Sequence, residues 1–263
     1  MIGRGIKGWL IAACVLILAG GLLFCGVMSC IGWDFSRLAT VKYETKRYEI
    51  SEEFDSIEIL DNTADILFLP SADGKAAVEC AESESCTYLV TVEDGTLRVA
   101  RQKEDGRPWW EMIAITAGEA AVTVYLPSDA YLALAVTLST GDVTVSCDFR
   151  FESIDIAVTT GDVVCRASAE RLELAASTGD ITLFDVTAGE IALTTSTGDI
   201  TVSGCDAERI ELVTGTGDVE GTLLTPKIFD AKSGTGDVCL PENGNGGTCR
   251  IRTNTGDIDI RLH

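Results

Sequence analysis

The residues best suited to chemistry are seven aspartates, each ending a Thr-Gly-Asp tripeptide that lies 18 to 20 residues from the next copy. They are Asp142, Asp162, Asp180, Asp199, Asp218, Asp237 and Asp257. If the tripeptides stack at the spacing of β-strands, about 4.8 Å, neighbouring carboxylates repel by about 1 kcal/mol in water, or about 3.5 kcal/mol at an effective dielectric constant of about 20. Calcium ions or backbone amides could each relieve that repulsion.

The tripeptide also has a purely structural explanation. Glycine adopts positive φ at little cost, as a tight turn requires, and aspartate accepts hydrogen bonds from nearby amides in an Asx-type turn. Threonine favours strand geometry and stacks on its copies. The glycines concerned are Gly141, Gly161, Gly179, Gly198, Gly217, Gly236 and Gly256. We therefore interpret the tripeptides as structural turns and keep a calcium-binding ladder as the alternative, since the denser spacing of calcium-binding nonapeptide repeats is missing.

The sequence offers little for enzymatic catalysis. Its only histidine is the last residue, His263, so neither a Ser-His-Asp nor a Cys-His arrangement has a suitable base. No phosphate-binding glycine loop of common spacing occurs. We predict no catalytic residues, no metal site and no cofactor. A carboxylate-dependent, carbohydrate-active β-helix enzyme is a third alternative, but acids that recur in every repeat are typical of a scaffold.

One aromatic pair stands apart from the repeats. Trp109 and Trp110 follow Arg107-Pro108 in a segment with loop-like composition. They could pack over the open end of the stacked strands. The alternative is a contact with a glycan or a protein partner, since exposed tryptophans anchor interfaces.

A period near 19 residues predicts one supersecondary unit stacked on copies of itself. Around Asp199, apolar residues stand eight and six positions before it (Ile191 and Leu193) and one and three positions after it (Ile200 and Val202). Such alternation is typical of strands with one buried face, and its change of phase at the tripeptide indicates a corner. We predict an all-β fold, a single-stranded β-solenoid with about 19 residues per coil, regular over residues 132–263.

Upstream of the regular repeats the pattern is degenerate. Residues 57–68 match the repeat with Ala64 in place of glycine, and we interpret them as the first coil. Residues 89–100 read as a hairpin around Asp94-Gly95, and residues 121–126 as a strand that ends at Pro127.

The coil that contains Asp257 is expected to end the stack. A bare solenoid end presents unpaired strand edges, which invite aggregation. Arg250, Arg252, Asp259 and Arg261 alternate with the inward residues of this coil, and their charges would protect the edge.

An uncharged segment between Trp9 and Trp33 is long enough to cross a bilayer and is bracketed by tryptophans, as membrane spans often are. We predict a short basic cytoplasmic end at 1–8, a transmembrane anchor at 9–33, a stalk or edge segment at 34–52, and a solenoid domain at 53–263. The short basic start favours a C-terminal body outside the cell.

The net charge of the chain limits the classes of partner that it can bind. The chain after Trp33 contains 41 acidic and 18 basic residues, so it repels nucleic acid, which we exclude as a partner. Three of the ten cysteines lie in the apolar segment, and the other seven are irregularly spaced. We interpret those seven mainly as apolar core residues, with one disulfide, Cys80 to Cys86, left open.

Three motifs carry a resemblance to a known family: Phe54-Asp55-Ser56-Ile57, Val122-Thr123-Val124-Tyr125-Leu126-Pro127, and the repeated Ser-Thr-Gly-Asp-Ile/Val. They resemble the bacterial putative-adhesin family of unknown function, which includes LiaG-like envelope proteins, over residues 43–263. The resemblance implies a β-helix-like, membrane-tethered domain without catalytic residues. It also implies a role in adhesion or in envelope-stress signalling, with a protein or another cell-envelope component as partner.

Overall fold

The computed structural model describes residues 4–30, 32, 41–83, 86–103, 116–117, 120–146 and 149–263. The chain divides into two compact units. The anchor unit comprises Met1–Tyr43 and Gly106–Gly118, and the solenoid unit comprises Glu44–Asp105 and Glu119–His263.

The anchor unit contains the expected apolar helix. Helix α1 spans Arg4–Cys30, and its segment Ala13–Cys30 is long and apolar enough to cross a membrane. Its described side chains are almost all exposed, including Trp9 at 81 %, as an uncovered apolar helix requires. Two short strands, β1 (Val41–Lys42) and β8 (Thr116–Ala117), pair in parallel in the same unit.

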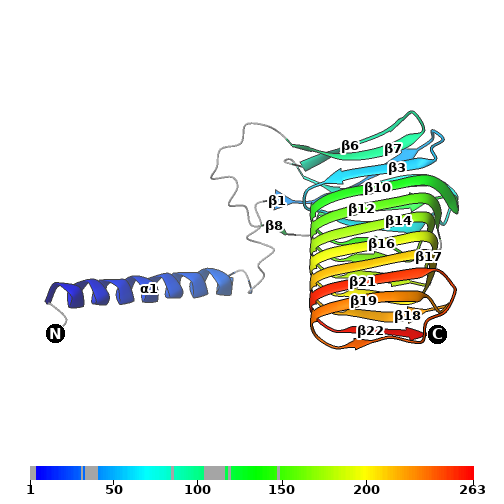
Figure 1. Ribbon diagram of the computed structural model, residues 1–263. Coiled ribbons are helices and arrows are strands. Elements are labelled where there is room, and N and C mark those ends of the chain that lie inside the picture. Colours follow the sequence, from blue (N-terminus) through cyan, green and yellow to red (C-terminus); the bar gives the residue numbers. More distant parts are fainter. Residues whose placement is uncertain are drawn as a thin grey trace. The chain divides into compact units, whose positions relative to one another are not determined.

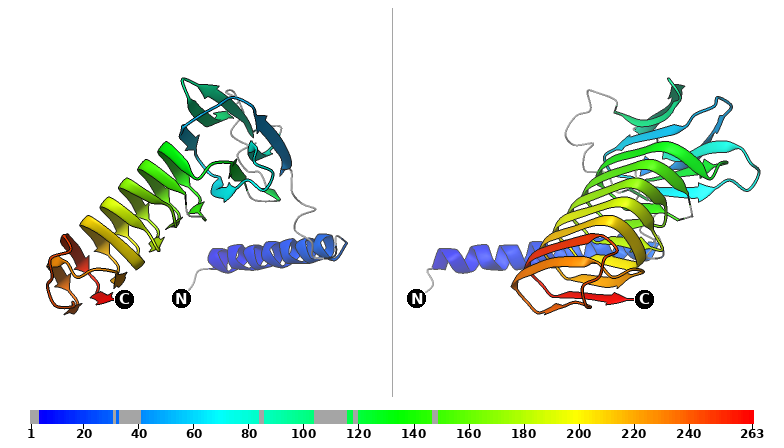
Figure 2. Two further views of the ribbon diagram at one scale, coloured as in Figure 1. Left: turned by 90° about the vertical axis from the view of Figure 1, so that its right-hand side faces the viewer. Right: turned by 45° about the vertical axis from the view of Figure 1, so that its right-hand side comes forward.

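The solenoid unit confirms the predicted fold class, and its 20 strands form one hydrogen-bonded sheet that folds into two faces (Figures 1 and 2). The long-strand face contains β3 (Ser56–Asp61), β6 (Cys86–Glu93), β7 (Thr96–Lys103), β10 (Ala130–Thr140), β12 (Arg150–Thr160), β14 (Ser168–Thr178), β16 (Thr187–Thr197), the second half of β17 (Ile200–Thr216), β19 (Ile228–Thr235) and β21 (Thr248–Thr255).

The short-strand face lies across the core from it, and the first half of β17 belongs to it. Its other strands are β2 (Glu44–Ile50), β4 (Asp65–Pro70), β5 (Ala76–Glu82), β9 (Ala121–Leu126), β11 (Val143–Val145), β13 (Val163–Cys165), β15 (Ile181–Phe184), β18 (Val219–Leu223), β20 (Val238–Cys239) and β22 (Ile258–Leu262).

Inward side chains follow the alternation read from the sequence. In the coil of Asp199, Ile191, Leu193, Ile200 and Val202 are all buried. In-register parallel pairing repeats this set from coil to coil, so equivalent residues stack on one another. Each coil alone has one apolar layer and no core, because its inward side chains are covered only by the coils above and below it.

The cysteines of the solenoid unit are free thiols where the structure describes them. Five are buried, as expected of core residues, and they include Cys80 and Cys86, which are not joined by a disulfide. Cys239 departs from the expectation because it is exposed, and Cys147 lies outside the described residues.

The degenerate copy stacks directly on the regular repeats. Strands β3 and β4 pair with β10 and β11, so Asp65 lies beside Asp142 although 77 residues separate them in the chain. Among the intervening residues, β7 and β9 form a further layer on β3 and β4, on the side opposite to β10 and β11. This copy is therefore first in the chain but not at the end of the stack.

Two local predictions in that intervening stretch are confirmed. Strands β6 and β7 form the hairpin, and its turn residues Asp94 and Gly95 both have positive φ. Strand β9 spans the predicted residues and ends before Pro127.

The prediction for the other end of the stack was wrong. Strand β21 lies between β17 and β19, and β22 lies between β18 and β20 (Figure 1). The coil of Asp257 is thus inserted into the stack, and the preceding coil, with β19, β20 and Asp237, is the end. The exchange buries the more apolar coil, since Ile251, Ile258 and Ile260 are at most 1 % exposed while Val238 is 45 % exposed.

A buried lysine holds the loop that makes this exchange possible. The Nζ atom of Lys227, whose side chain is 1 % exposed, donates to the carboxylate of Asp206, to the hydroxyl of Thr225 at 2.8 Å and to the carbonyls of Ala207 (2.7 Å) and Gly246. Gly246 belongs to the connection between β20 and β21. The ammonium therefore joins this loop to the coil beneath it.

Candidate functional site

The Thr-Gly-Asp tripeptides lie in one column along the corner of the solenoid. The seven glycines have φ angles between 128° and 148°, a region that other residues rarely adopt. A Cβ atom on Gly198 would lie 2.0 Å from the carbonyl oxygen of Gly179 in the neighbouring coil. Glycine is therefore required twice, by its own backbone conformation and by the close approach of the coil beside it.

The corner aspartates form a continuous hydrogen-bonded ladder. Oδ1 of each aspartate accepts the backbone N–H of the aspartate in the next coil, with N···O distances of 2.7 to 2.9 Å. The spatial order is Asp65, Asp142, Asp162, Asp180, Asp199, Asp218, Asp257 and Asp237. We expected the amide to come from the same turn; it comes from the adjacent coil, so the carboxylate joins coils to one another.

This ladder provides the relief that a column of charges needs. A hydrogen bond from an amide to an ionised carboxylate is stronger than one between neutral groups. The seven tripeptide aspartates remain exposed, so water also screens their repulsion. The structure thus shows how the column can persist without any bound ion.

A second column, of buried hydroxyl groups, was missed by the sequence analysis. The side chains of Thr195, Thr214 and Thr253 donate to the carbonyls of Gly179, Gly198 and Gly217 at 2.9 to 3.1 Å. Ser233 donates in the same way to Gly256 at 2.8 Å. All four stand four residues before a corner aspartate, at the inward parity, so a polar residue at a core position was the available signal.

We predict that Asp199→Ala lowers the free energy of unfolding by about 1 to 2 kcal/mol, since it removes the acceptor for the Asp218 amide. Asp199→Asn keeps an oxygen in place of Oδ1 and should cost less than about 1 kcal/mol. Urea denaturation of both variants measures the difference. An alanine variant more stable than the parent would show that repulsion along the column outweighs the hydrogen bonds.

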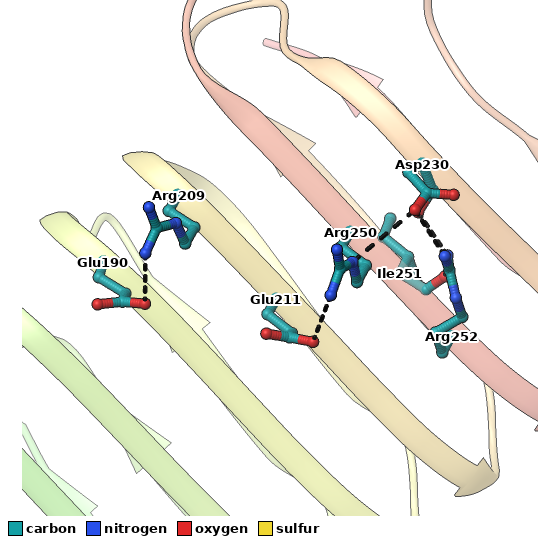
Figure 3. A network of polar contacts seen from close by, with 7 residues as sticks. All are labelled: Glu190, Arg209, Glu211, Asp230, Arg250, Ile251 and Arg252. Carbon is teal, nitrogen blue, oxygen red and sulfur yellow. Dashed lines mark hydrogen bonds and ion pairs between the residues drawn. The ribbon is translucent and has the colours of Figure 1, made fainter.

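Ion pairs extend across the outside of the long-strand face (Figure 3). Glu190 lies between Arg171 and Arg209, with N···O distances of 3.7 and 3.4 Å. Further along, Arg250 lies between Glu211 (3.6 Å) and Asp230 (3.8 Å). Arg252 also binds the Asp230 carboxylate, at 2.6 Å. Because the pairs join successive coils, the outside of this face carries alternating charges.

Two open grooves lie at the β2 end of the solenoid unit. One, of about 590 Å³, is bordered by β2 and β6 and is lined by Arg47, Glu49, Glu52 and Glu93 among others. The other, of about 690 Å³, is lined partly by Glu53, Lys75 and Tyr131. In the described part of the chain, no group of three or more His, Cys, Asp or Glu side chains could hold a metal ion. Trp109 and Trp110, the predicted partner contact, lie outside the described residues.

Comparisons with known proteins agree with this fold. The family model described as Toastrack DUF4097 matches residues 54–263. A putative adhesin from Bacteroides fragilis has 15 % identity and a TM-score of 0.50, covering 84 % of this chain and 97 % of its own. At these identities the similarity shows the fold alone.

Two further solved structures are more distant. A putative lipid binding protein from Parabacteroides distasonis has 15 % identity and a TM-score of 0.46, covering 85 % of this chain and 98 % of its own. A putative cell adhesion protein from Clostridium sporogenes has 13 % identity and a TM-score of 0.33, covering 84 % and 100 %. No curated protein matches the chain.

Proposed function

Because the chain belongs to the Toastrack DUF4097 family, we propose that it is a non-catalytic interaction module, held in the membrane by α1 and presenting an acidic solenoid outside the cell. It would serve in adhesion or as an accessory of envelope-stress signalling. The observation that carries the proposal is the corner ladder. Since Oδ1 of every corner aspartate except the terminal Asp237 joins two coils, we infer that the repeated acids build the scaffold and that the charged long-strand face remains available to a partner.

The membrane part of the proposal depends on α1. Its apolar side chains are mostly exposed, among them Leu16, Ile17 and Leu22 at 72 %, 73 % and 76 %, and a bilayer would bury them. Arg4 and Lys7 precede the span, but Arg37, Lys42, Lys46 and Arg47 follow it, so the count of basic residues in the two flanks does not favour a cytoplasmic amino terminus. The proposed orientation depends on the very short basic start before an apolar run, as in a signal anchor, and on the fact that long domains translocate largely regardless of charge. The solenoid unit would then face the exterior.

Cys239 provides a test of this orientation. We expect a membrane-impermeant maleimide to label Cys239 on intact cells at pH 8, and Cys239→Ser to remove that label. The buried thiols should not react, because burial raises the pKa of Cys80, Cys165 and Cys249 to about 12. A raised pKa keeps the thiol protonated until the pH approaches that value, so the reactive thiolate is scarce at pH 8. Labelling only after permeabilisation would contradict an external body.

The partner can be sought from the charged face. A photo-crosslinking amino acid at Glu173, which is exposed on β14, would capture a protein or other envelope component that docks there on intact cells. The same photo-crosslinking amino acid in place of Lys75, which is exposed in the turn before β5, is the matched control on another part of the surface. A product specific to position 173 would support the proposal. Identical products at both positions would oppose this face as the docking site.

A calcium-binding scaffold is the second candidate. It is favoured by the exposure of the stacked corner carboxylates. They accept the hydrogen bonds from backbone amides through Oδ1 only. Calcium at 100 times its dissociation constant would add about 2.7 kcal/mol of stability to the folded chain. Isothermal titration and thermal melting of the full chain in detergent, with Asp199→Asn as comparison, would detect it. No heat and no rise in melting temperature would end this candidate.

A carbohydrate-active enzyme is the third and weakest candidate. It rests only on the general ability of paired carboxylates to cleave glycosidic bonds. A screen for polysaccharide degradation tests it directly, and release of reducing ends by the purified chain would overturn the non-catalytic proposal.

A further inference from the structure

The end of the stack presents an unpaired strand edge. Strand β19 pairs with β21 on one side, and no strand among the described residues pairs with the other. The N–H of Phe229 points away from β21 and is bonded by the side chain of Asn243 at 3.0 Å, so a strand that pairs with Phe229 at this edge must displace the Asn243 side chain. Because amides alternate along a strand, Ala231 and Ser233 present their N–H and C=O groups at the same open edge.

This end is also incompletely covered. The inward side chains Phe229 and Ala231 are only partly buried, whereas their counterparts inside the stack are buried. Ile228 is 55 % and Val238 is 45 % exposed. Solenoid ends need a cap to remain soluble, and an open edge with apolar side chains is a template for another strand.

The charge distribution identifies a second copy as the occupant. Residues 34–227 contain 36 acidic and 14 basic residues, whereas residues 228–263 contain five acidic and four basic residues. Two copies would repel one another along most of their length. They repel one another least when they approach through these nearly neutral ends.

The outward charges on β19 are themselves self-complementary. Asp230 and Lys232 are both exposed and lie on either side of Ala231. When two β19 strands pair antiparallel about a two-fold axis at Ala231, Asp230 of each copy faces Lys232 of the other. Moving the two-fold axis by one residue, from Ala231 to Lys232, would instead set Lys232 against Lys232, so opposite charges select the first register.

We propose that the chain forms a two-fold dimer in which β19 of one copy pairs antiparallel with β19 of a second copy, with Asp230 opposite Lys232. A two-fold dimer uses the same surface patch twice, which is the commonest arrangement of soluble homo-oligomers. Pairing continues the long-strand face from one copy into the other and covers the open ends of both cores.

The geometry has a consequence that rests on the proposed function. The chain enters the solenoid unit at Glu44 in β2, at the opposite end of the stack from β19. The dimer therefore has its two entry points at its two far ends. If each copy is membrane-anchored, this arrangement suits copies carried by two facing membranes, and the adhesion would be between like molecules.

Lys232→Glu tests the pairing without weakening the single copy. Residue 232 lies beside Arg252 in the in-register pairing of β19 with β21, so glutamate there shares Arg252 with Asp230 within its own chain. In the dimer it would face Asp230 of the second copy and repel it. Lys75→Glu makes the same charge change in the turn before β5 and is the matched control. Matching far-UV circular dichroism spectra of both variants and the parent confirm that the fold is intact, since loss of the dimer by itself lowers the melting temperature.

The full chain in detergent micelles is expected to have twice the monomer mass by light scattering, as is Lys75→Glu, whereas Lys232→Glu is expected to be monomeric. Ala231→Cys, in a Cys239→Ser background, should form a disulfide between copies, since paired Cα atoms lie about 5.5 Å apart. Thr235→Cys should not, because the same register separates its copies by roughly 27 Å.

Three results would overturn the dimer. The first is a monomeric parent chain, which would leave the edge to a strand of a different protein. The second is a Lys232→Glu variant that still dimerises, for instance through α1, and the third is cross-linking at Thr235→Cys in preference to Ala231→Cys. Vesicles that carry the chain should cluster, and those with Lys232→Glu should not. A detergent dimer without vesicle clustering would refute the facing-membrane arrangement and leave the pairing intact.

Discussion

Gly198→Ala is expected to lower the free energy of unfolding by about 3 to 5 kcal/mol, the sum of backbone strain and overpacking. Gly198 has φ of 146°, and a Cβ atom there would lie 2.0 Å from the carbonyl oxygen of Gly179. That oxygen belongs to the backbone of the adjacent coil, so it cannot move without disturbing the stack. Differential scanning calorimetry should show a fall in melting temperature of about 10 °C or more.

Gly74→Ala separates the two causes of that loss. Gly74 also has positive φ, at 71°, but a Cβ atom there would meet nothing within 4 Å. Alanine should therefore cost only the backbone strain, about 1 to 2 kcal/mol. Gly236→Ala in the end coil repeats the clash, with 2.1 Å to the Gly256 carbonyl oxygen, but a coil covered on one side can shift and should lose less than Gly198→Ala. Equal losses at Gly74 and Gly198 would show that stacking is not what requires glycine in the corner.

Lys227→Met is expected to cost about 3 to 5 kcal/mol, the loss typical of breaking a buried ion pair by removing one partner. The change leaves the Asp206 carboxylate without its ammonium, and it deprives Thr225 and the carbonyls of Ala207 and Gly246 of a shared donor. The connection that carries the chain from β20 to β21 should loosen, so guanidinium denaturation and hydrogen exchange of residues 240–247 should both report the loss.

Two controls accompany Lys227→Met. Arg209→Ala breaks an exposed ion pair with Glu190 on the long-strand face and should cost no more than about 1 kcal/mol. The double variant Lys227→Met with Asp206→Leu removes the unpaired charge together with its partner and should recover part of the stability. If Lys227→Met costs no more than Arg209→Ala, the buried ammonium does not hold the loop.

The repeated and the variable side chains lie in different parts of the solenoid. In the corner column, every aspartate before the terminal Asp237 accepts an amide of the adjacent coil through Oδ1. The side chains that differ between coils, such as Glu190, Arg209 and Arg250, lie outside on the long-strand face (Figure 3). Under the proposed function, a partner would contact the variable charged side chains of this face and not the repeated corner residues.

The solenoid, the coil length and the inward residues could all be predicted from the amino-acid pattern, because a strand buries every second side chain and a glycine at positive φ marks each corner. Such information is local, and it repeats every 19 residues or so. It also allowed the hairpin at Asp94-Gly95 and the strand ending before Pro127 to be located.

The order in which the coils stack could not be predicted in this way and follows from the folded protein. Asp65 joins Asp142 across 77 residues, and the coil of Asp257 is inserted between those of Asp218 and Asp237. Near-identical coils offer nearly identical edges, so their local patterns cannot rank the possible neighbours. The order depends on the total burial of the ends and on contacts such as that of Lys227, which unite residues distant in the chain.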